Sequence, residues 1–297
     1  MSEHPPPTLD SPASIAAIYP HKGPQHFPVV LGQMEQRVQL VTTWGIEHGE
    51  NVIEIGCGQG DCTVVLATAV GDAGHVTAID PASLDYGSPY TLGQAQAHLR
   101  ASPVGKRIDF VQADPLEFLH GSTDKYTTAV LAQCIWYFSS PKTLSAILAA
   151  LAPRVKRICL SEYALTASDS RAVPHLLAAL TQASLECRKP TSKSNIRTVL
   201  SPAALKAAAS TAGLTLLKEE TVVPPEGMLD GRWEVGAVLA DDFEIEVQES
   251  IQDERERALV FAMRDAVRAA RDALTAKEER VHTMDIWIAT YATATYQ

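Results

Sequence analysis

The stretch VIEIGCGQGD, from Val52 to Asp61, places a short apolar run with one acid, Glu54, directly before a glycine-rich turn. The apolar run predicts a buried strand over 51–55. In the turn, glycine occupies every second position, at Gly56, Gly58 and Gly60. Without Cβ atoms, this backbone can approach a ligand more closely than any other residue type would allow. A helix that begins near Asp61 would point its free N–H groups at the same place, so the stretch predicts a ligand site.

Around this stretch, segments with strand and helix patterns alternate. Strands are expected at 51–55, 75–80, 107–112, 128–133 and 157–162, and helices at 61–70, 92–101, 115–119 and 141–151. Alternation of this kind indicates βαβ units, and therefore a parallel sheet with helices on both faces. Because βαβ crossovers are right-handed, we expect a doubly wound α/β fold. In such folds, ligands bind outside the carboxyl ends of the strands.

The rest of the chain divides into three parts. Residues 1–12 are polar and rich in proline, and are expected to form a disordered leader. Residues 13–45 are expected to form an N-terminal lid that includes an amphipathic helix over 31–44. Residues 46–297 are expected to form one domain, with an insertion at about 224–280 before a last strand. The insertion contains a long charged helix, about 251–276, whose apolar stripe Leu259, Met263, Val267 and Ala270 is expected to face the protein.

Composition excludes several classes of function. The chain has 297 residues and a formal net charge of -10, which disfavours nucleic-acid binding and anionic membrane surfaces. No apolar run approaches the roughly 20 residues that span a bilayer, so a soluble protein is expected. The five cysteines form no CxxC pair and no Cys/His ligand spacing. We therefore expect no metal site and a reducing compartment, the cytoplasm.

Spacing within the glycine turn indicates which ligand is bound. A dinucleotide site reads GxGxxG, but here the position of its third glycine is Asp61, whose charge would repel a pyrophosphate. Downstream, Asp80 ends the second expected strand, where an acid can accept hydrogen bonds from ribose hydroxyls. Asp114 ends the third. Each acid also precedes a proline, so an ordinary role as a helix N-cap stays open for both.

Glu54 and the three glycines give E-x-G-x-G-x-G, which resembles motif I of the class I S-adenosylmethionine-dependent methyltransferases. The resemblance covers about 44–163, and the chain is loosely similar to small-molecule enzymes of the quinone-biosynthesis type. The resemblance implies a Rossmann-like seven-stranded sheet whose antiparallel strand is the terminal one, 285–291. It implies S-adenosylmethionine as cofactor and S-adenosylhomocysteine as product. In the family, Glu54 would lie near the methionine end and Asp114 near the adenine amino group. The residues that the resemblance implies at the cofactor are Glu54, Gly56, Cys57, Gly58, Gly60, Asp80, Pro81, Ala113, Asp114 and Gln133.

The segment AQCIWYFSSP after the fourth strand is where the family places groups beside the transferred methyl. It lacks the D/N-P-P-Y tetrad of enzymes that methylate nucleobases or glutamine. Cytosine-5 enzymes would require a proline before the cysteine, but here Gln133 precedes Cys134. Residues expected in the acceptor pocket are His26, Trp136, Tyr137, Tyr163 and Trp233. Candidate catalytic residues are Tyr19, His21 and Glu162. Simpler roles stay open: solvated loop histidines, packing aromatics, and a capping or ion-paired Glu162. His175 is expected on a helix surface.

These observations predict methyl transfer to a small organic acceptor. Methylation of a hydroxyl oxygen is favoured slightly over methylation of nitrogen or carbon. Positioning of the acceptor in line with an activated methyl group would supply much of the acceleration. The alternatives are a methyltransferase fold that catalyses a non-methylating step such as a cyclisation, a partner protein with a vestigial site, and a nicotinamide-dependent oxidoreductase. A homodimer is compatible with the length of the insertion.

Overall fold

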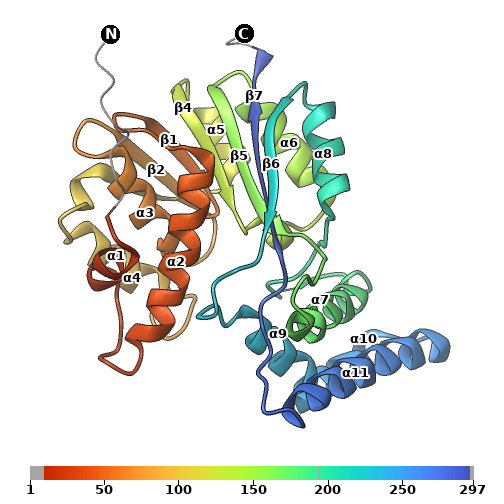
Figure 1. Ribbon diagram of the computed structural model, residues 1–297. Coiled ribbons are helices and arrows are strands. Elements are labelled where there is room, and N and C mark those ends of the chain that lie inside the picture. The colour runs from red at the N-terminus through yellow and green to blue at the C-terminus, as the bar shows by residue number, and fades with distance from the viewer. Residues whose placement is uncertain (1–9, 193, 295–297) are drawn as a thin grey trace.

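A seven-stranded sheet forms the centre of the protein in a computed structural model, which describes residues 10–192 and 194–294 (Figure 1). Its order is β3-β2-β1-β4-β5-β7-β6, and β7 runs antiparallel to both neighbours. The doubly wound α/β fold with an antiparallel terminal strand is therefore confirmed. The strands are β1 (Asn51–Ile55), β2 (His75–Asp80), β3 (Ile108–Gln112), β4 (Tyr126–Ala132), β5 (Val155–Tyr163), β6 (Thr215–Val222) and β7 (Ile286–Ala292).

Helices cover both faces because alternate strand residues point to opposite sides of the sheet. Val130 on β4 packs with α1 to α3, and its neighbour Leu131 packs on the other face with α6 and α8. The helices of the sheet region are α1 (Pro12–Ile18), α2 (Phe27–Trp44), α3 (Asp61–Val70), α4 (Leu92–Arg100), α5 (Pro115–Gly121), α6 (Pro141–Leu151), α7 (Val173–Glu186) and α8 (Pro202–Thr211). Among the residues described, no helix is both long and apolar enough to cross a membrane.

A helical appendage follows β6, where the insertion was expected. It contains α9 (Asp230–Leu239), α10 (Asp241–Ser250) and α11 (Glu254–Thr275), which pack with α7. Figure 1 shows the appendage beyond the end of the sheet from which α7 emerges. The polar pattern of 224–250 gave no sign of the first two helices.

The expected apolar stripe of α11 is confirmed at Val267, which is buried, and is wrong at Leu259, while Met263 and Ala270 are half-buried. Leu259 is exposed, while Val260 and Arg264 are buried. The Arg264 guanidinium donates hydrogen bonds to the carbonyl oxygens of Val238, Leu239 and Ala240, at 3.1–3.2 Å. Burial of this face satisfies the carbonyl groups at the end of α9 that have no partner within the helix.

At the N-terminus, residues 1–9 of the expected leader lie outside the described residues. Helix α1 begins at Pro12, and the Ser11 hydroxyl caps it by accepting a hydrogen bond from the Ser14 N–H at 3.2 Å. Helix α2 begins at Phe27, before the expected start at 31. Its Gly32 lies against the backbone of Gly227, where a Cβ would come within 2.4 Å. This close approach brings α2 and the start of the appendage together over one edge of the sheet.

Candidate active site

The glycine turn after β1 has left-handed backbone at Gly56, Gly58 and Gly60, with φ of +75°, +52° and +87°. A Cβ on Gly56 would lie 2.5 Å from Cβ of Cys134, and one on Gly60 would lie 2.7 Å from Cδ1 of Leu99. A Cβ on Gly58 would meet no atom of the described residues within 4 Å. The outer two glycines are therefore required by packing, and Gly58 faces open space that a ligand can use.

Asp80, at the end of β2, anchors this turn. One carboxylate oxygen accepts from the Gly58 N–H at 2.8 Å, and the other accepts from the Ala82 N–H at 2.9 Å. The Gln96 side chain donates to the Gly58 carbonyl at 3.0 Å. These bonds hold Gly58 in its left-handed conformation with the Asp80 carboxylate beside it. A contact between Asp80 and a ribose stays a prediction.

Asp114 caps α5, as the simpler interpretation of the sequence suggested. Its Oδ1 accepts from the N–H groups of Leu116 and Glu117, at 2.8 and 3.1 Å. Its neighbour Ala113 is held by a hydrogen bond from its N–H to the Asp80 carbonyl at 3.1 Å, while Pro81 is exposed. The cap fixes Asp114 at the carboxyl end of β3, and its predicted role at an adenine is compatible with this place.

Glu54 is a buried carboxylate near the end of β1, two residues before Gly56. Its Oε2 accepts from the Thr63 hydroxyl at 2.5 Å, and only 1% of the residue is exposed. Burial raises the pKa of Glu54 to about 7, because the charged form loses its water. A cation placed here would favour the ionised form.

Arg37 on α2 is a site residue that sequence reasoning missed. Its guanidinium donates to Asp61 Oδ2 at 2.7 and 2.8 Å, to the Gln36 side chain at 2.5 Å, and to the side-chain oxygen of Gln133. Asp61 is thus paired with a cation across the site. The signal that could have revealed Arg37 is its spacing. Arg37 lies three residues after Met34 and four before Val41, and therefore on the apolar face of the helix.

Two amide groups beside Arg37 keep unpaired donors. The Nε2 atoms of Gln36 and Gln133 are buried and have no hydrogen-bond partner among the described residues. Gln133 also has a left-handed backbone, with φ of +51°. Because unpaired buried donors are costly, this end of the site suits a ligand with acceptor atoms, such as a carboxylate.

The Glu162 carboxylate holds the loop after β4. It accepts from the N–H groups of Ile135, Trp136 and Tyr163, at 3.1, 3.2 and 3.0 Å. Burial raises the pKa of Glu162 to about 7, against the effect of these donors. Since three backbone groups occupy the carboxylate, the geometry favours a positioning role over the predicted catalytic one. Cys134 in the same loop is buried, and burial raises the pKa of its thiol.

Above this loop, Tyr163 connects the sheet to the appendage. Its hydroxyl donates to Asp230 Oδ1 at 2.9 Å, and its ring lies 5.2 Å from that of Trp136. Asp230 Oδ2 is buried without a hydrogen-bond partner in the described part of the chain. Burial raises the pKa of Asp230, with Arg37 opposing the shift. Nothing in the pattern MLDGRWE distinguished this acid from a loop residue.

His175 is completely buried, and the expectation that it lies on a helix surface is wrong. Helix α7 packs against α9 and α11, so its His175 face is covered. The ring stands edge-on to that of Tyr163, at 5.0 Å, and Nδ1 accepts from the Met284 N–H at 3.0 Å. Burial lowers the pKa of His175 to about 3, so the ring is neutral at physiological pH.

The rim of the site carries exposed aromatic rings. Tyr137 is 47% exposed. Partial desolvation of this residue, together with the negative charges of Glu234 and Asp230, raises its pKa. Glu234, one turn after Asp230 on α9, accepts a hydrogen bond from Gln182 of α7. Trp233 is half-exposed rather than enclosed in a pocket.

The predicted lid residues separate into two groups. Tyr19 is buried near the Asp61 and Arg37 charges, and burial together with Asp61 raises its pKa. His21 stacks edge-on against Phe27 at 5.4 Å. His26 closes a local turn, its Nδ1 accepting from the Lys22 N–H at 3.3 Å. The structure therefore brings Tyr19 to the site, and gives His26 a local partner.

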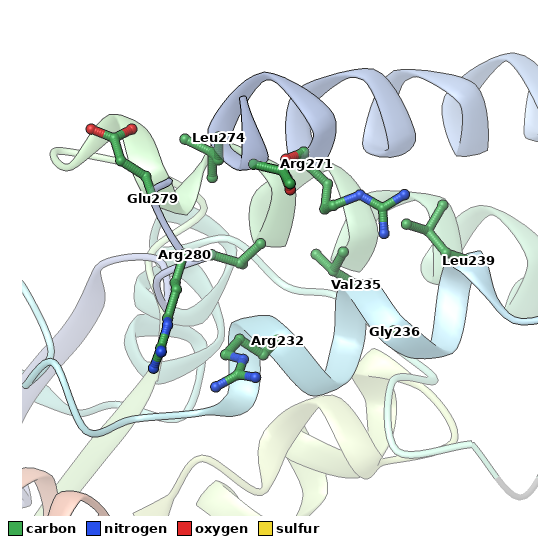
Figure 2. A pocket seen from close by; sticks show the side chains of 10 residues that line it. Arg232, Val235, Gly236, Leu239, Arg271, Leu274, Glu279 and Arg280 are labelled. Carbon is green, nitrogen blue, oxygen red and sulfur yellow. Dashed lines mark hydrogen bonds between the residues drawn. The ribbon is translucent and has the colours of Figure 1, made fainter. Parts of the chain in front are cut away.

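Two further features lie apart from this edge of the sheet. A cavity of about 310 Å³ lies between α9 and α11. Figure 2 shows Arg232 and Arg280 at one side of it, beside apolar side chains such as Val235 and Leu274. Asp169, Glu226 and His282 place possible metal ligand atoms within 4.8 Å of one another. The Arg171 guanidinium already donates to both carboxylates, at 2.6 and 2.5 Å, so these acids are balanced by an arginine.

Comparisons with known proteins agree with this geometry. Residues 52–156, which contain the glycine turn, Asp80, Asp114 and the loop after β4, match a methyltransferase domain family. The methyltransferase phomM of Diaporthe leptostromiformis is 28% identical, with 87% of this chain and 83% of phomM covered.

Two solved structures share the fold. A cyclopropane-fatty-acyl-phospholipid synthase-like protein from Lactobacillus casei superimposes with a TM-score of 0.81 at 27% identity, over 95% of this chain and 98% of its own. The YcgJ protein of Bacillus subtilis has a TM-score of 0.51 at 12% identity, over 87% of this chain and 97% of its own, and shows the fold alone. Motif, sheet order and family match agree, and they identify residues 52–156 as a methyltransferase domain of the class I S-adenosylmethionine-dependent type.

Proposed function

We propose that this enzyme methylates a hydroxyl group of a small organic acceptor, by in-line displacement. The observation that carries the proposal is the carboxylate of the half-buried Asp230. One of its oxygens is held by Tyr163, while the other is buried and unpaired within the described chain. A hydroxyl acceptor must lose a proton as it is methylated, and a positioned base assists that step. Asp230 is a carboxylate of raised pKa at the correct edge of the sheet.

The residues present fit the cofactor that the family requires. Gly58 opens onto free space, Asp80 lies beside it for a ribose, and Asp114 stands at the next strand end for an adenine. Arg37, with the unpaired amides of Gln36 and Gln133, offers donors for a carboxylate. When bound, S-adenosylmethionine supplies a methyl group on a sulfonium that is already activated.

The chain's own residues then divide the remaining work. Asp230 accepts the proton of the acceptor hydroxyl, and Tyr163 orients Asp230 through the 2.9 Å hydrogen bond. Glu162 holds the loop of Trp136 and Tyr137 in place. Tyr19 closes the site from the lid. The neutral His175 packs behind Tyr163 and is not needed as a base.

An amine acceptor is the second candidate, and the charges at the rim favour it. Asp230 and Glu234 lie one turn apart on α9, and the exposed Tyr137 ring stands near both. Acids with an aromatic ring suit an ammonium ion, through charge and cation–π attraction. Asp230 would then bind the cation and take its proton.

Product analysis distinguishes these reactions. The enzyme is incubated with S-adenosylmethionine and matched phenols, alcohols and amines, and products are identified by mass spectrometry. A mass gain of one methylene group on oxygen, with release of S-adenosylhomocysteine, is expected. Methylation of amines alone would replace the hydroxyl proposal by the second candidate. A rearranged product of unchanged mass would indicate a cyclisation and contradict both.

Cofactor affinity is expected to depend on pH through Glu54. Its pKa of about 7 means that the free enzyme holds a neutral carboxyl at pH 6 and a carboxylate at pH 8. Because the cofactor brings positive charge, S-adenosylmethionine should bind about tenfold more tightly at pH 8 than at pH 6. In the free protein, the same shift lowers stability as pH rises from the usual glutamate range toward 7, since the unfolded chain loses its proton first.

Isothermal titration calorimetry at both pH values measures this effect. In Glu54→Gln the affinity should be weaker and independent of pH, while Glu47→Gln, an exposed neighbour, should behave as the wild type. A wild-type affinity that stays constant from pH 6 to pH 8 would show that Glu54 does not contact the charged end of the cofactor.

A further inference from the structure

A second cavity lies beside the loop that carries Trp136 and Tyr137. Its volume is about 670 Å³, the size of a small-molecule site. Residues 139–141 at the start of α6 form one wall, residues of the last turn of α7 form a second, and the segment that follows α7 forms the third. The polar residues that matter here are Ser139, Ser140, Glu186, Lys189, Arg197 and Thr198.

This cavity shares a wall with the acceptor site. The N–H groups of Arg197 and Thr198 donate to the Trp136 carbonyl, at 2.8 and 3.0 Å. Two residues after Tyr137, the same loop reaches Ser139, which lines the cavity. On α7, Gln182 bonds to Glu234 at the rim, and Glu186 lies one turn further on. The cavity is therefore adjacent to the loop of Trp136 and Tyr137 and to the Gln182–Glu234 hydrogen bond.

Glu186 presents an unsatisfied acceptor at this wall. Only 7% of the residue is exposed, and its Oε1 lies 2.7 Å from the Lys189 ammonium. Its Oε2 is buried and has no hydrogen-bond partner in the described residues. A buried carboxylate oxygen without a donor is costly, so a ligand hydroxyl that donates to it would be stabilising.

Arg197 presents a cation that lacks an acidic partner among the described residues. Lys189 is balanced by Glu186 and by Glu246, at 2.7 and 2.5 Å. The Arg197 guanidinium donates to the Ser194 carbonyl through Nε, at 3.1 Å, and has no ion pair with an acid in the described part of the chain. A guanidinium with hydroxyl groups around it is suited to bind a carboxylate or a phosphate.

We propose that this cavity binds an anionic polyol group, with a carboxylate or phosphate on Arg197 and a hydroxyl on Glu186. This group is the distal part of the methyl acceptor, and that second statement rests on the proposed function. The shared chemistry of carboxylate and phosphate is an anion of two or more acceptor oxygens, which a planar guanidinium can bind through paired hydrogen bonds.

Cys187 provides a reporter for occupancy. It lines the cavity, and it is the one exposed cysteine of the five, all of which lie in the described residues. The rate of its alkylation by N-ethylmaleimide is measured with gluconate, glucose 6-phosphate or glucose present. At about ten times the dissociation constant, a bound probe should slow alkylation about tenfold. Gluconate and glucose 6-phosphate should protect at lower concentrations than glucose, and their order identifies the anion.

Arg197→Gln should weaken protection by both anionic probes about tenfold or more and bring them to the level of glucose. Glu186→Gln should weaken all three. Arg268→Gln removes a half-buried arginine of α11, which pairs with Asp265 on the same helix, and should change nothing. Equal protection by glucose and the charged probes, or full protection in Arg197→Gln, would overturn the proposal, as would no protection by any probe. Because this assay needs no methyl transfer, protection in an enzyme that methylates no hydroxyl or amine would support the cavity and contradict the proposed function alone.

Discussion

Gly58→Val is expected to abolish measurable binding of S-adenosylmethionine, with a loss of affinity of at least about a hundredfold. The valine side chain would occupy the open space that faces Gly58, where no atom of the described residues lies within 4 Å. The variant should still fold, because only the backbone strain of φ +52° at a residue with a Cβ opposes it, about 1–2 kcal/mol. Calorimetric titration with S-adenosylmethionine and S-adenosylhomocysteine measures the loss.

Gly213→Val is the matched control. Gly213 follows α8, has φ of +75°, and likewise has open space around a Cβ. It should suffer the same strain and a similar fall in melting temperature, and bind the cofactor as the wild type does. If Gly58→Val binds normally, the cofactor does not approach the glycine turn, and the arrangement of the whole site is wrong.

Asp230→Asn is expected to lower kcat for methyl transfer by at least about a hundredfold, the usual contribution of a positioned general base. The asparagine keeps the size of the side chain and can still accept the Tyr163 hydrogen bond, but it cannot take a proton. Affinity for S-adenosylhomocysteine should stay unchanged, because Asp230 lies on the acceptor side. Asp242→Asn, in the exposed first turn of α10, serves as control.

The pH profile separates a base from a merely structural residue. Burial raises the pKa of Asp230, so the wild-type rate should increase with pH through a range above the usual one for aspartate. This acidic limb should disappear in Asp230→Asn. In Tyr163→Phe the limb should persist and shift, because the hydrogen bond from the tyrosine stabilises the charged carboxylate. A normal rate in Asp230→Asn would remove the base from the mechanism.

The sequence was most informative where structure depends on neighbours along the chain. Strands β1 and β2 and helices α3 and α6 have the expected bounds, because apolar runs, glycines and proline starts act locally. The motif after β1 also gave the predicted cofactor site, since three glycines share one turn directly after the strand that carries Glu54. Glu162 was correctly placed at the end of its strand, but its three backbone partners come from folding.

Polar residues that reach a site from helices distant in the sequence could not be predicted in the same way. Arg37, Asp230 and Glu186 reach their sites on α2, α9 and α7, which are far apart in the sequence and meet only through tertiary packing. The sequence around each of these polar residues contains no recognisable motif. The role of each residue depends on which of its hydrogen bonds are satisfied in the folded protein.

By itself, then, the sequence determined the alternation of strands and helices over residues 51–163 and the glycine turn at which the cofactor is proposed to bind, because local backbone geometry and hydrophobic periodicity are encoded residue by residue. Only the tertiary structure decided that Asp61 pairs with Arg37, that His175 is buried and neutral, and that one oxygen of Asp230 has no hydrogen-bond partner among the residues described. Charge, burial and hydrogen-bond partners arise between elements that are distant in the chain, and these quantities exist only once the elements have packed.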